Sequence, residues 1–420
     1  MELRLVGIRT NEKEAMEVGD LERHLGIPGS QIKLWAKKSL IKSFSGTGNK
    51  RLFLLEEVRN QHLRMQGKSE PTLFKVLESG SRTPYTCIDL FAGAGGTALG
   101  LSRAGLNHTL LVENDRDAAS TLESNMKDWN VRCANVEDVD FTNEKVDVIE
   151  AGFPCQAFSY AGNKRGFGDT RGTLFFEFAR ALEQSRPKIA IGENVRGMLK
   201  HDGGRTLSTI LEKMGDLGYS VGYKILRSQY LDVAQKRERL FIIGVRKDLD
   251  FPILFPKEQD YLLTLRDVFK DVPRSIGQQY SEKKQKVLEQ VPPGGYWRDL
   301  PEEVQKEYMG VSYYRTGGRT GMARRLAWDE PSLTLTCSPG QKHTERCHPG
   351  ETRPLTVREY ARVQSFPDEW EFRGSLSSQY KQIGNAVPVN MAYHIGRSII
   401  AMLDGEYDET HFERFEINRD

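Results

Sequence analysis

The sequence predicts an α/β protein built on an open, doubly wound sheet, and three observations support this. Between residues 85 and 250, apolar segments prone to form strands alternate with helical segments, which is typical of a sheet with helices on both faces. The first strand runs directly into a glycine-rich loop, Gly93-Ala94-Gly95-Gly96. The alternation stops between about 250 and 350, where Pro, Gly and Arg dominate.

The composition narrows the class of protein. The chain has 420 residues, with 60 Lys and Arg against 58 Asp and Glu, so its net charge is +2 and its length suggests two to three domains. It has no apolar run near the ~18 residues of a membrane span, and its charged N-terminus lacks the apolar stretch of a secretory signal. Five scattered cysteines without a CxxC pair argue against a disulfide framework and favour a reducing cytoplasm. Membrane, secreted, collagenous and disordered classes are therefore excluded.

Residues 1–70 are predicted to form a separate, basic helical domain. Residues 30–68 hold nine basic and two acidic side chains, a local charge of +7, which leaves about −5 for the rest of the chain. The pattern indicates a helix, a turn at 26–29, a second helix capped by Ser30, a hairpin, and a third helix over 54–66. Such a charge suits contact with nucleic acid, and the alternative is a solvated basic extension.

This first domain resembles the winged helix-turn-helix of MerR-type regulators. The resemblance implies that the second helix, with Lys33 and Lys37, enters a major groove and that the hairpin tip, with Lys50 and Arg51, contacts phosphates. It also implies dimerisation through this domain, since such units read two half-sites. A linker is expected to follow over residues 71–84.

The elements of the sheet are expected in regular order after the linker. Strands are predicted at residues 86–91, 108–113, 131–134, 145–151 and 188–192. The helices between them include residues 115–127 and 174–184. An antiparallel pair, at 219–227 and 240–245, is expected to complete the sheet.

Reactive side chains follow several of these strands, at the carboxyl edge where such sheets bind ligands. Glycines let the backbone approach a ligand after the first strand, and Glu113 at the end of the second is placed to accept ribose hydroxyls. Cys155 is a candidate nucleophile on a loop stiffened by Pro154, and Glu193 ends a further strand. Each has a structural alternative, as a tight turn, a small core thiol or a solvated carboxylate. Because groups from two strand ends can converge on one substrate, a catalytic site is favoured.

Six motifs follow one another along the chain: FAGAGG at 91–96, GFPCQAFS at 152–159, GENV at 192–195, QKRER at 235–239, RPLTVREYARVQSFP at 353–367 and QIGNAVPVNMA at 382–392. By these motifs, the chain from about 85 to 403 resembles a DNA cytosine-5 methyltransferase of the bacterial restriction–modification type. The resemblance implies a Rossmann-like methyltransferase sheet as the catalytic domain and a smaller target-recognition domain. The implied divisions are a catalytic domain over 85–260, a target-recognition domain over 261–378, a C-terminal helix completing the catalytic domain over 379–405, and a tail over 406–420.

The resemblance also implies how the chemistry is divided. Cys155 adds as a thiolate to carbon-6 of a cytosine flipped out of the duplex, and the resulting enamine attacks the methyl donor from carbon-5. Glu193 holds a proton at ring nitrogen 3, while Arg239 binds the base carbonyl and orients Glu193. Arg237 and Gln235 are implied as supports and DNA contacts.

S-adenosylmethionine is the methyl donor that the resemblance implies. Phe91 would stack on its adenosine, Glu113 would take the ribose, and the glycine backbone would face the methionine end. The implied cofactor residues are Phe91, Gly93, Gly95, Gly96, Glu113, Asn114, Asn135, Val136, Leu174, Asn385 and Val387. Two of them depart from the family's pattern, because Asn114 replaces an aromatic residue and Asn135 replaces an aspartate.

The Arg-rich second domain is expected to read DNA. Arg315 and Arg319, spaced by glycines and aromatic residues, suit contacts with base edges and phosphates. Thr334 lies in a Thr-Leu pair that resembles one near the end of the family's recognition domain. No metal is expected, since the Cys and His residues at 337–348 match no common zinc-finger spacing.

The leading hypothesis is methylation of duplex DNA in the bacterial cytoplasm, which protects it from a cognate restriction endonuclease, with an N-terminal domain that binds DNA to regulate its own operon. A tRNA cytosine-5 methyltransferase shares the catalytic motifs, but the basic N-terminal domain and the Arg-rich region favour duplex DNA. A regulator with an inactive catalytic domain is disfavoured by the intact Cys155, Glu193 and Arg239. A nicotinamide dehydrogenase would explain the glycine loop and Glu113 but not GFPCQAFS.

Overall fold

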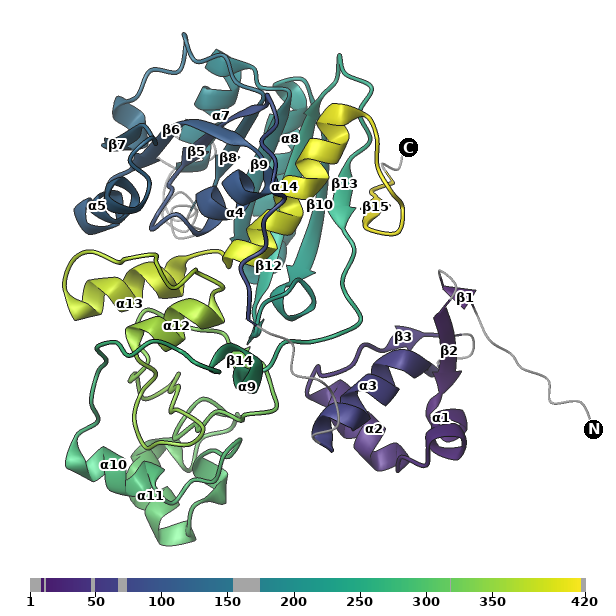
Figure 1. Ribbon diagram of the computed structural model, residues 1–420, viewed down its shortest axis with the longest axis vertical. Coiled ribbons are helices and arrows are strands. Elements are labelled where there is room, and N and C mark those ends of the chain that lie inside the picture. Colours follow the sequence, from purple (N-terminus) through teal and green to yellow (C-terminus); the bar gives the residue numbers. More distant parts are fainter. Residues whose placement is uncertain are drawn as a thin grey trace, which may run out of the picture.

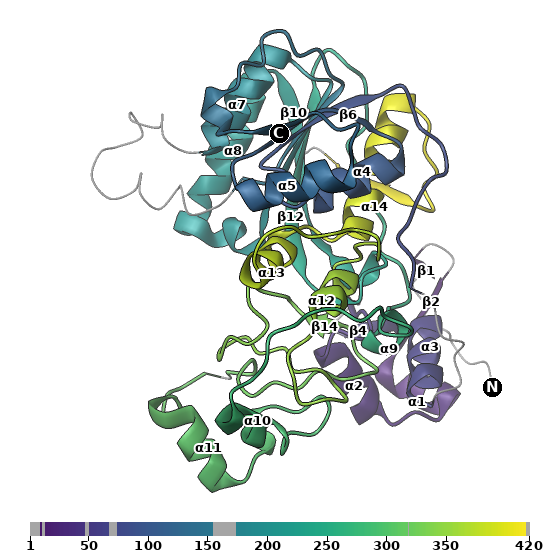
Figure 2. The ribbon, with the colours of Figure 1, turned by 60° about the vertical axis from the view of Figure 1, so that its left-hand side comes forward.

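The computed structural model describes residues 9–10, 13–46, 50–66, 74–153, 174–317 and 319–416. A large sheet covered by helices forms one end of the molecule, a smaller lobe forms the other, and the N-terminal domain lies beside them (Figure 1). The turned view in Figure 2 places α12 (Val357–Val363) and α13 (Leu376–Asn385) between the sheet and the lobe. Among the helices of the described residues, none has both the length and the apolar character needed to cross a bilayer.

The central sheet has seven strands in the order β10-β12-β9-β8-β5-β6-β7. Their bounds are β5 Thr86–Leu90, β6 Asn107–Glu113, β7 Val131–Cys133, β8 Val148–Ala151, β9 Ile189–Val195, β10 Tyr219–Arg227 and β12 Glu238–Arg246. Strands β5, β6, β7, β8 and β9 run parallel to one another, whereas β12 is antiparallel to both of its neighbours. This confirms the predicted α/β sheet and its antiparallel pair. Strand β9 is longer than predicted because it pairs with β12 as far as Val195, so Glu193 lies inside the strand.

Helices cover both faces of the sheet because its strands are apolar on both sides. The helices are α4 Gly96–Ala104, α5 Arg116–Asn125, α7 Leu174–Ser185, α8 Arg205–Asp216 and α14 Val389–Asp404. Successive strand residues point to opposite faces. Cys87 and Ile189 accordingly join a core with α4 and α14, whereas Ile88 and Ile149 join a core with α7 and α8.

The C-terminal helix approaches α4 unusually closely. A Cβ on Gly96 would lie 2.2 Å from the carbonyl oxygen of Val387, and one on Gly100 would lie 2.4 Å from that of Val389. Only glycine permits such an approach of backbone to backbone. The start of α14 therefore packs directly against α4, just behind the loop that follows β5.

The smaller lobe has an apolar core of its own. Buried residues of this core run from Leu288 to Cys347 and include Trp297 and Met309. The flanking segments, around α9 (Leu265–Val268) and α12, instead share a second core with the sheet domain. The lobe contains α10 Glu282–Leu288 and α11 Glu302–Met309, and β11 Gln235–Lys236 pairs with β14 Ser332–Leu333. Strands β13 Leu254–Pro256 and β15 Phe412–Arg414 pair with each other and pack on α14 in the core of the sheet domain. Short 3₁₀ helices occur at Val136–Asp138, Arg196–Gly204, Ser228–Tyr230, Trp297–Asp299 and Gly310–Ser312.

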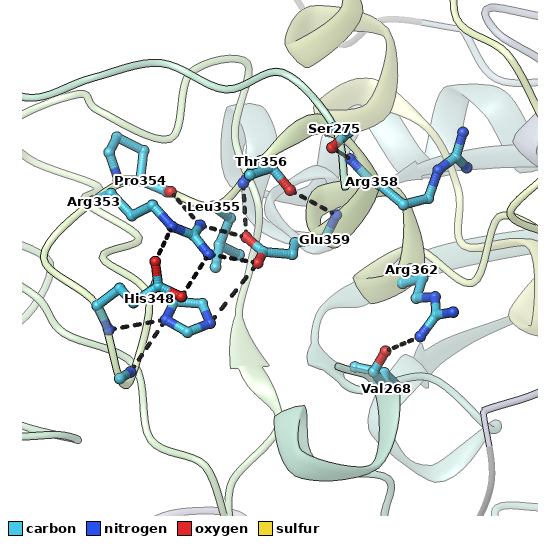
Figure 3. A network of polar contacts seen from close by, with 12 residues as sticks. Val268, Ser275, His348, Arg353, Pro354, Leu355, Thr356, Arg358, Glu359 and Arg362 are labelled. Carbon is cyan, nitrogen blue, oxygen red and sulfur yellow. Dashed lines mark hydrogen bonds and ion pairs between the residues drawn. The ribbon is translucent and has the colours of Figure 1, made fainter. Parts of the chain in front are cut away.

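A polar network supports the layer between the lobe and the sheet (Figure 3). Arg353 donates to both carboxylate oxygens of Glu359, at 2.7 and 2.8 Å, and Glu359 also accepts from the backbone N–H of Thr356 at the start of α12. The Nε2 of His348 lies 3.8 Å from Glu359, and burial lowers the pKa of this histidine. A paired, buried carboxylate that also caps a helix fixes the start of the 353–367 motif.

The N-terminal domain contains the expected helix, turn, helix, hairpin and helix, preceded by two short strands. These elements are β1 Arg9–Thr10, β2 Lys13–Glu17, α1 Val18–Leu25, α2 Gly29–Lys37, β3 Phe44–Ser45, β4 Arg51–Leu54 and α3 Leu55–Met65. The strands pair in the order β1-β2-β4-β3. The predicted Ser30 cap is wrong, because α2 begins at Gly29 after Pro28 and no side chain caps it.

This domain packs against the stretch from Tyr230 to Leu262, which follows strand β10. Tyr230 and Leu262 are buried in the same apolar core as Ile32 and Trp35. The Nζ of Lys42 donates to the carbonyl oxygen of Glu258 at 3.1 Å. Part of the basic charge therefore faces the protein rather than solvent, which the sequence pattern does not show.

The described part of the predicted linker, residues 74–84, is also held in place. Asn390 on α14 accepts from the backbone N–H of Leu77 at 2.9 Å and donates to the carbonyl oxygen of Lys75 at 3.1 Å. Phe74 packs in the second core, with the guanidinium of Arg362 4.9 Å from its ring centroid. Residues 74–84 are thus attached to the sheet domain along their length.

Candidate active site

A cavity of about 810 Å³ opens at the carboxyl edge of the parallel strands. This volume lies within the range of ligand pockets. Segments far apart in the sequence line it, namely 91–94, 96–97, 113–115, 118, 152–153, 193–195, 237, 239, 334–337, 381–382 and 384–387. The predicted site residues in this lining are Phe91, Gly93, Gly96, Glu113, Asn114, Glu193, Arg237, Arg239, Thr334, Asn385 and Val387.

The loop after β5 presents backbone to the cavity. Phe91 has a positive φ of 62°, as do Gly93 at 54° and Gly95 at 89°, so the chain turns sharply where the strand ends. No atom lies within 4 Å of a Cβ built on Gly93, which leaves open space there. Glu113 accepts from the backbone N–H groups of Gly93 and Asp115, each at 2.7 Å, so its carboxylate is fixed at the cavity wall.

The two positions that depart from the family's pattern contact one another. The Nδ2 of Asn114 donates to the Oδ1 of Asn135 at 3.3 Å, and Asn135 donates in turn to Asp138 at 3.4 Å. Val136 is buried, and both it and Leu174 pack into the core under the sheet. Asn135, Val136, Leu174 and Gly95 lie outside the cavity lining in this structure, and their expected contacts with the cofactor stay predictions.

An ion pair at the cavity joins β9 to β12. The Nε of Arg239 lies 2.7 Å from the Oε1 of Glu193, and their side chains are only 13% and 12% exposed. Burial raises the pKa of Glu193, while Arg239 and Arg237 oppose that rise. The carboxyl therefore retains a proton more readily than a solvated one, as a group that must donate a hydrogen bond requires.

Arg237 connects its own segment to two others that line the cavity, at 335 and at 384–385. It is 2% exposed and donates to the carbonyl oxygens of Leu335 at 3.2 Å, Gly384 at 3.1 Å and Asn385 at 3.3 Å. Burial, and then the charge of Arg239, lowers the pKa of Arg237 to about 9. Its implied role as a support agrees with these contacts, whereas its burial leaves it unavailable to DNA in this structure.

The expected DNA contact of Gln235 is wrong for this structure, because the side chain is fully buried. Its Nε2 donates to Gln364 at 2.7 Å, and its Oε1 accepts from the N–H of Leu335 at 2.9 Å. Thr334 lines the cavity, and its hydroxyl donates to the carbonyl oxygen of Lys236 at 2.7 Å. Both residues thus connect β11 with the segment that leaves the lobe.

Cys155 and Pro154 lie outside the described residues. The strand that leads to them is placed, since Gly152 and Phe153 line the cavity. Asn194 on β9 donates to the carbonyl oxygen of Phe153 at 2.8 Å and is itself buried. Phe153 is therefore held by Asn194, the residue that directly follows Glu193 in the sequence.

The two predicted arginines of the lobe differ in their surroundings. Arg315 is exposed, and it lies beside Tyr314, which is 78% exposed. Arg319 instead donates to the carbonyl oxygens of Arg315 at 2.7 Å and Thr316 at 2.9 Å. Arg319 consequently stabilises its own loop in this structure, and its expected contact with DNA stays a prediction.

The predicted cations of the N-terminal domain all reach solvent. Lys33, Lys37, Lys50 and Arg51 are exposed, and Lys50 forms an ion pair with Glu17 at 2.7 Å. These side chains leave a cationic surface on α2 and on the base of the β3–β4 hairpin. Such a surface suits phosphate contacts, which remain a prediction.

Several residues of the cavity lining were not predicted from the sequence, among them Lys381, Cys337 and Thr336. The Nζ of Lys381 donates to Asp115 at 2.8 Å, and this contact lowers the pKa of Asp115. The thiol of Cys337 lies 3.1 Å from the Oδ1 of Asn385, and Thr336 completes that wall. Lys381 lies one residue before the last motif, and that proximity is the only signal the sequence offers. Across the described ranges, no three His, Cys, Asp or Glu side chains are grouped to hold a metal ion.

Comparisons with known proteins agree with this geometry. Residues 85–401 match the family model described as C-5 cytosine-specific DNA methylase. The chain is 51% identical over 407 residues to the type II methyltransferase M.Eco47II of Escherichia coli, with 93% of this chain and 97% of that relative covered. It is 55% identical over 332 residues to M.PspPI of a Psychrobacter strain, with 76% and 80% covered.

One solved structure and one relative inform the remaining parts. The structure is described as a DNA modification methyltransferase encoded within an E. coli prophage; it covers 76% of this chain and 99% of its own, with a TM-score of 0.57 and 24% identity, and it supports the fold. The match to M.Eco47II leaves only about 29 residues of this chain uncovered, although 84 precede the family match. That relative therefore shares much of the N-terminal domain.

Proposed function

The chain belongs to the C-5 cytosine-specific DNA methylase family, and we propose that it is a site-specific methyltransferase of a type II restriction–modification system. It methylates a cytosine in duplex DNA in the bacterial cytoplasm and so protects its recognition sites from a cognate endonuclease. The observation that carries this proposal is the convergence of the glycine loop, Glu113, Glu193 and Arg239 on one cavity. Phe153, two residues before Cys155, lies in the same lining.

Methyl transfer from labelled S-adenosylmethionine tests the proposal directly. The label is expected in duplex DNA and not in tRNA, and bisulfite sequencing of DNA from an expressing host should reveal one protected sequence. Label in tRNA with none in DNA would refute the choice of substrate. No label in either would refute the methyltransferase assignment.

The proposed reaction gives each residue one task. The target base must leave the stack before carbon-6 is accessible. The thiolate of Cys155 then bonds to carbon-6, and a proton that Glu193 holds at nitrogen 3 prevents negative charge from accumulating on the ring. Arg239 orients Glu193 through their 2.7 Å ion pair and binds the base carbonyl. After methylation, loss of the carbon-5 proton and departure of the thiolate restore the aromatic ring.

The cavity fits S-adenosylmethionine, which supplies an electrophilic methyl group on a sulfonium when bound. Glu113 offers a fixed carboxylate to the ribose hydroxyls, since two backbone N–H groups orient it. Phe91 lines the cavity and can stack on the adenosine, while open space at Gly93 admits the methionine end. Asn385 and Val387 close the opposite wall.

Exchanging residues 288–347, with residues 334–337 of the cavity wall kept, for those of a relative with another recognition sequence is expected to change the sequence methylated. The lobe has its own core, and Glu193 and Arg239 lie outside it, so the chemistry should survive. Bisulfite sequencing of host DNA measures the outcome, with the unmodified enzyme as control. An active hybrid that keeps its original site would place specificity elsewhere.

We further propose that the N-terminal domain binds operator DNA as a MerR-like dimer and regulates the enzyme's own operon. Its exposed cations on α2 and the hairpin support this role, as does its separation from every catalytic motif. A competing account is that the docked domain raises affinity for substrate DNA. Glu330 forms ion pairs with Lys38, which directly follows α2, at 2.6 Å and with Lys236 at 3.2 Å. These two contacts connect the N-terminal domain with the segment next to the cavity and favour the competing account.

Replacing Lys33 and Lys37 together with alanine should weaken operator binding and reduce its salt dependence by up to about two phosphate contacts. Methylation rates should stay near wild type if the regulatory account holds. Footprinting of upstream DNA and methylation assays separate the two accounts, and Arg59→Ala, an exposed cation of α3 paired with Glu56, is the matched control. Crippled methylation without any upstream footprint would refute the regulatory proposal.

Deleting residues 1–66 is expected to lower the stability of the remaining chain. The loss should exceed that from deleting a domain that makes no contact with the rest of the protein. The deletion exposes Tyr230 and Leu262, now 1% and 4% exposed, and burial of two such side chains stabilises by about 2 kcal/mol or more. Thermal unfolding of the truncated and full-length proteins measures the difference. Unchanged unfolding temperatures would mean that the contact between the domains contributes little.

A further inference from the structure

Two acidic side chains are buried side by side in the middle of the sheet, apart from the residues that line the cavity. Asp89 on β5 and Glu150 on β8 are register partners in a parallel pair, so both side chains leave the same face. Each is 1% exposed. Within the described part of the chain, no donor is placed to satisfy either oxygen of Asp89 or the Oε1 of Glu150. A hydrogen bond from one carboxyl to the other remains to them.

These two residues continue a row of carboxyls across four adjacent strands. Glu150 pairs with Ile191, two positions before Glu193, and residues two positions apart share a face. Asp89 pairs with Leu111, two positions before Glu113. Glu113, Asp89, Glu150 and Glu193 therefore lie on one face, in that order along the sheet. The row connects the wall expected to hold the methyl donor with the acid expected to act on the base.

Two neighbouring carboxylates without donors cannot both be charged in an apolar core. Burial raises the pKa of both groups, most strongly for Glu150, where the charge of Asp89 adds to the effect. Burial and the charge of Glu113 raise the pKa of Asp89, and the hydrogen bond from Glu150 opposes this rise. Of the two carboxyls, Glu150 holds the shared proton more tightly, so the negative charge lies mainly on Asp89.

We propose that Asp89 and Glu150 hold one proton between them and that the negative charge they retain favours the protonated form of Glu193. They are positioning residues for the reaction, since neither lines the cavity. The proposal rests on the proposed role of Glu193. It answers a difficulty in that role, because Arg237 and Arg239 both draw the proton away from Glu193.

The charges around the two sites come from every strand packed against them. Glu193 faces Arg239 on β12, Arg237 beside it, and Glu150 on β8. The pair faces Glu113 on β6 and the thiol of Cys87 on β5, whose pKa burial raises. The arginines lower the proton affinity of Glu193, and the charge of the pair raises it, so removing that charge should release the proton at lower pH.

Two substitutions separate the charge from the shape of the pair. Asp89→Asn leaves a neutral pair, because Glu150 stays protonated. The alkaline limb of kcat should then move to lower pH by about one unit, the size expected of one charge two strands away. Glu150→Gln mimics the protonated acid and keeps the charge on Asp89, so its limb should stay at the wild-type position. The assay is methyl transfer from labelled S-adenosylmethionine to unmethylated bacterial DNA between pH 5 and 10.

The outcomes divide cleanly. A shift in Asp89→Asn with none in Glu150→Gln supports the proposal. Equal profiles for both variants and wild type would overturn it, as would an upward shift in Asp89→Asn. Glu193→Gln keeps the two proposals distinguishable. If that variant is inactive while the Asp89→Asn limb does not move, only the positioning role fails; if it is as active as wild type, the proposed acid itself fails.

Thermal unfolding against pH provides a measurement that does not depend on activity. In the wild type, the folded pair retains a proton that the unfolded chain loses near pH 4, so its stabilising effect is complete at lower pH and is lost as pH rises through the raised folded pKa. Glu150→Gln removes that proton, and its unfolding temperature should fall less between pH 5 and 8. If the unfolding temperature changes equally with pH in the wild type and in Glu150→Gln, the pair holds no proton. That result would overturn the proposal even if Asp89→Asn does not fold.

Discussion

Replacing Cys155 with serine is expected to abolish methyl transfer while sequence-specific DNA binding persists. A serine hydroxyl is almost fully protonated at neutral pH and is a much poorer nucleophile than a thiolate. The loss should reach roughly 10⁴-fold or more in kcat, the scale seen when a nucleophile is removed. DNA binding should survive because the recognition lobe and the cationic surfaces are untouched. Turnover assays and mobility-shift titrations on the same DNA measure the two effects.

Covalent trapping identifies the thiol that reacts. DNA that carries 5-fluorocytosine should form a denaturant-stable complex with the wild type, because fluorine cannot leave carbon-5 as a proton does. The Cys155→Ser variant should form none. Cys337→Ser is the matched control, since the thiol of Cys337 lines the cavity and its variant should still be trapped. Trapping by Cys155→Ser, or its loss in Cys337→Ser, would assign the nucleophile to Cys337.

The central sheet could be predicted because strands buried on both faces form apolar runs in the sequence. Segment ends were less predictable, since they depend on partners elsewhere in the chain. Strand β9 continues to Val195 because β12 pairs with it, and no local pattern contains that information. Strand β2 (Lys13–Glu17) is polar and becomes a strand through its pairing with β4. The N-terminal domain likewise gave no local signal that it would pack on Tyr230.

Residue type predicted which side chains belong to the site better than it predicted the contacts that each of them makes. Glu193 and Arg239 were identified from separate motifs, and the sheet register brings them within 2.7 Å. Gln235 and Arg319 are side chains that suit DNA, but burial and backbone hydrogen bonds occupy them. Asp89 lies inside the predicted first strand, two residues before the FAGAGG motif. Its partnership with an acid on another strand depends on the register between strands, which a sequence pattern does not contain.

Replacing Arg239 with alanine is expected to lower kcat by roughly 100-fold or more, the loss found when a charged or polar group that stabilises a transition state is removed. Glu193 would lose the ion pair that orients it, and the base carbonyl would lose a donor. Lysine at this position keeps the charge but not the planar fork, so Arg239→Lys should recover part of the rate. Single-turnover methylation with saturating DNA measures the chemical step.

The pH dependence distinguishes this role from general damage to the fold. Arg239 lowers the pKa of Glu193 against the effect of burial, so its removal raises that pKa further. The residual activity of Arg239→Ala should therefore persist to higher pH than that of the wild type, opposite in sign to the shift expected for Asp89→Asn. Arg196→Ala is the matched control, because Arg196 pairs with Glu238 at 2.6 Å on the exposed side of the same strand pair. A slow Arg239→Ala enzyme whose alkaline limb stays in place would show that Arg239 acts on the base alone and does not tune the acid.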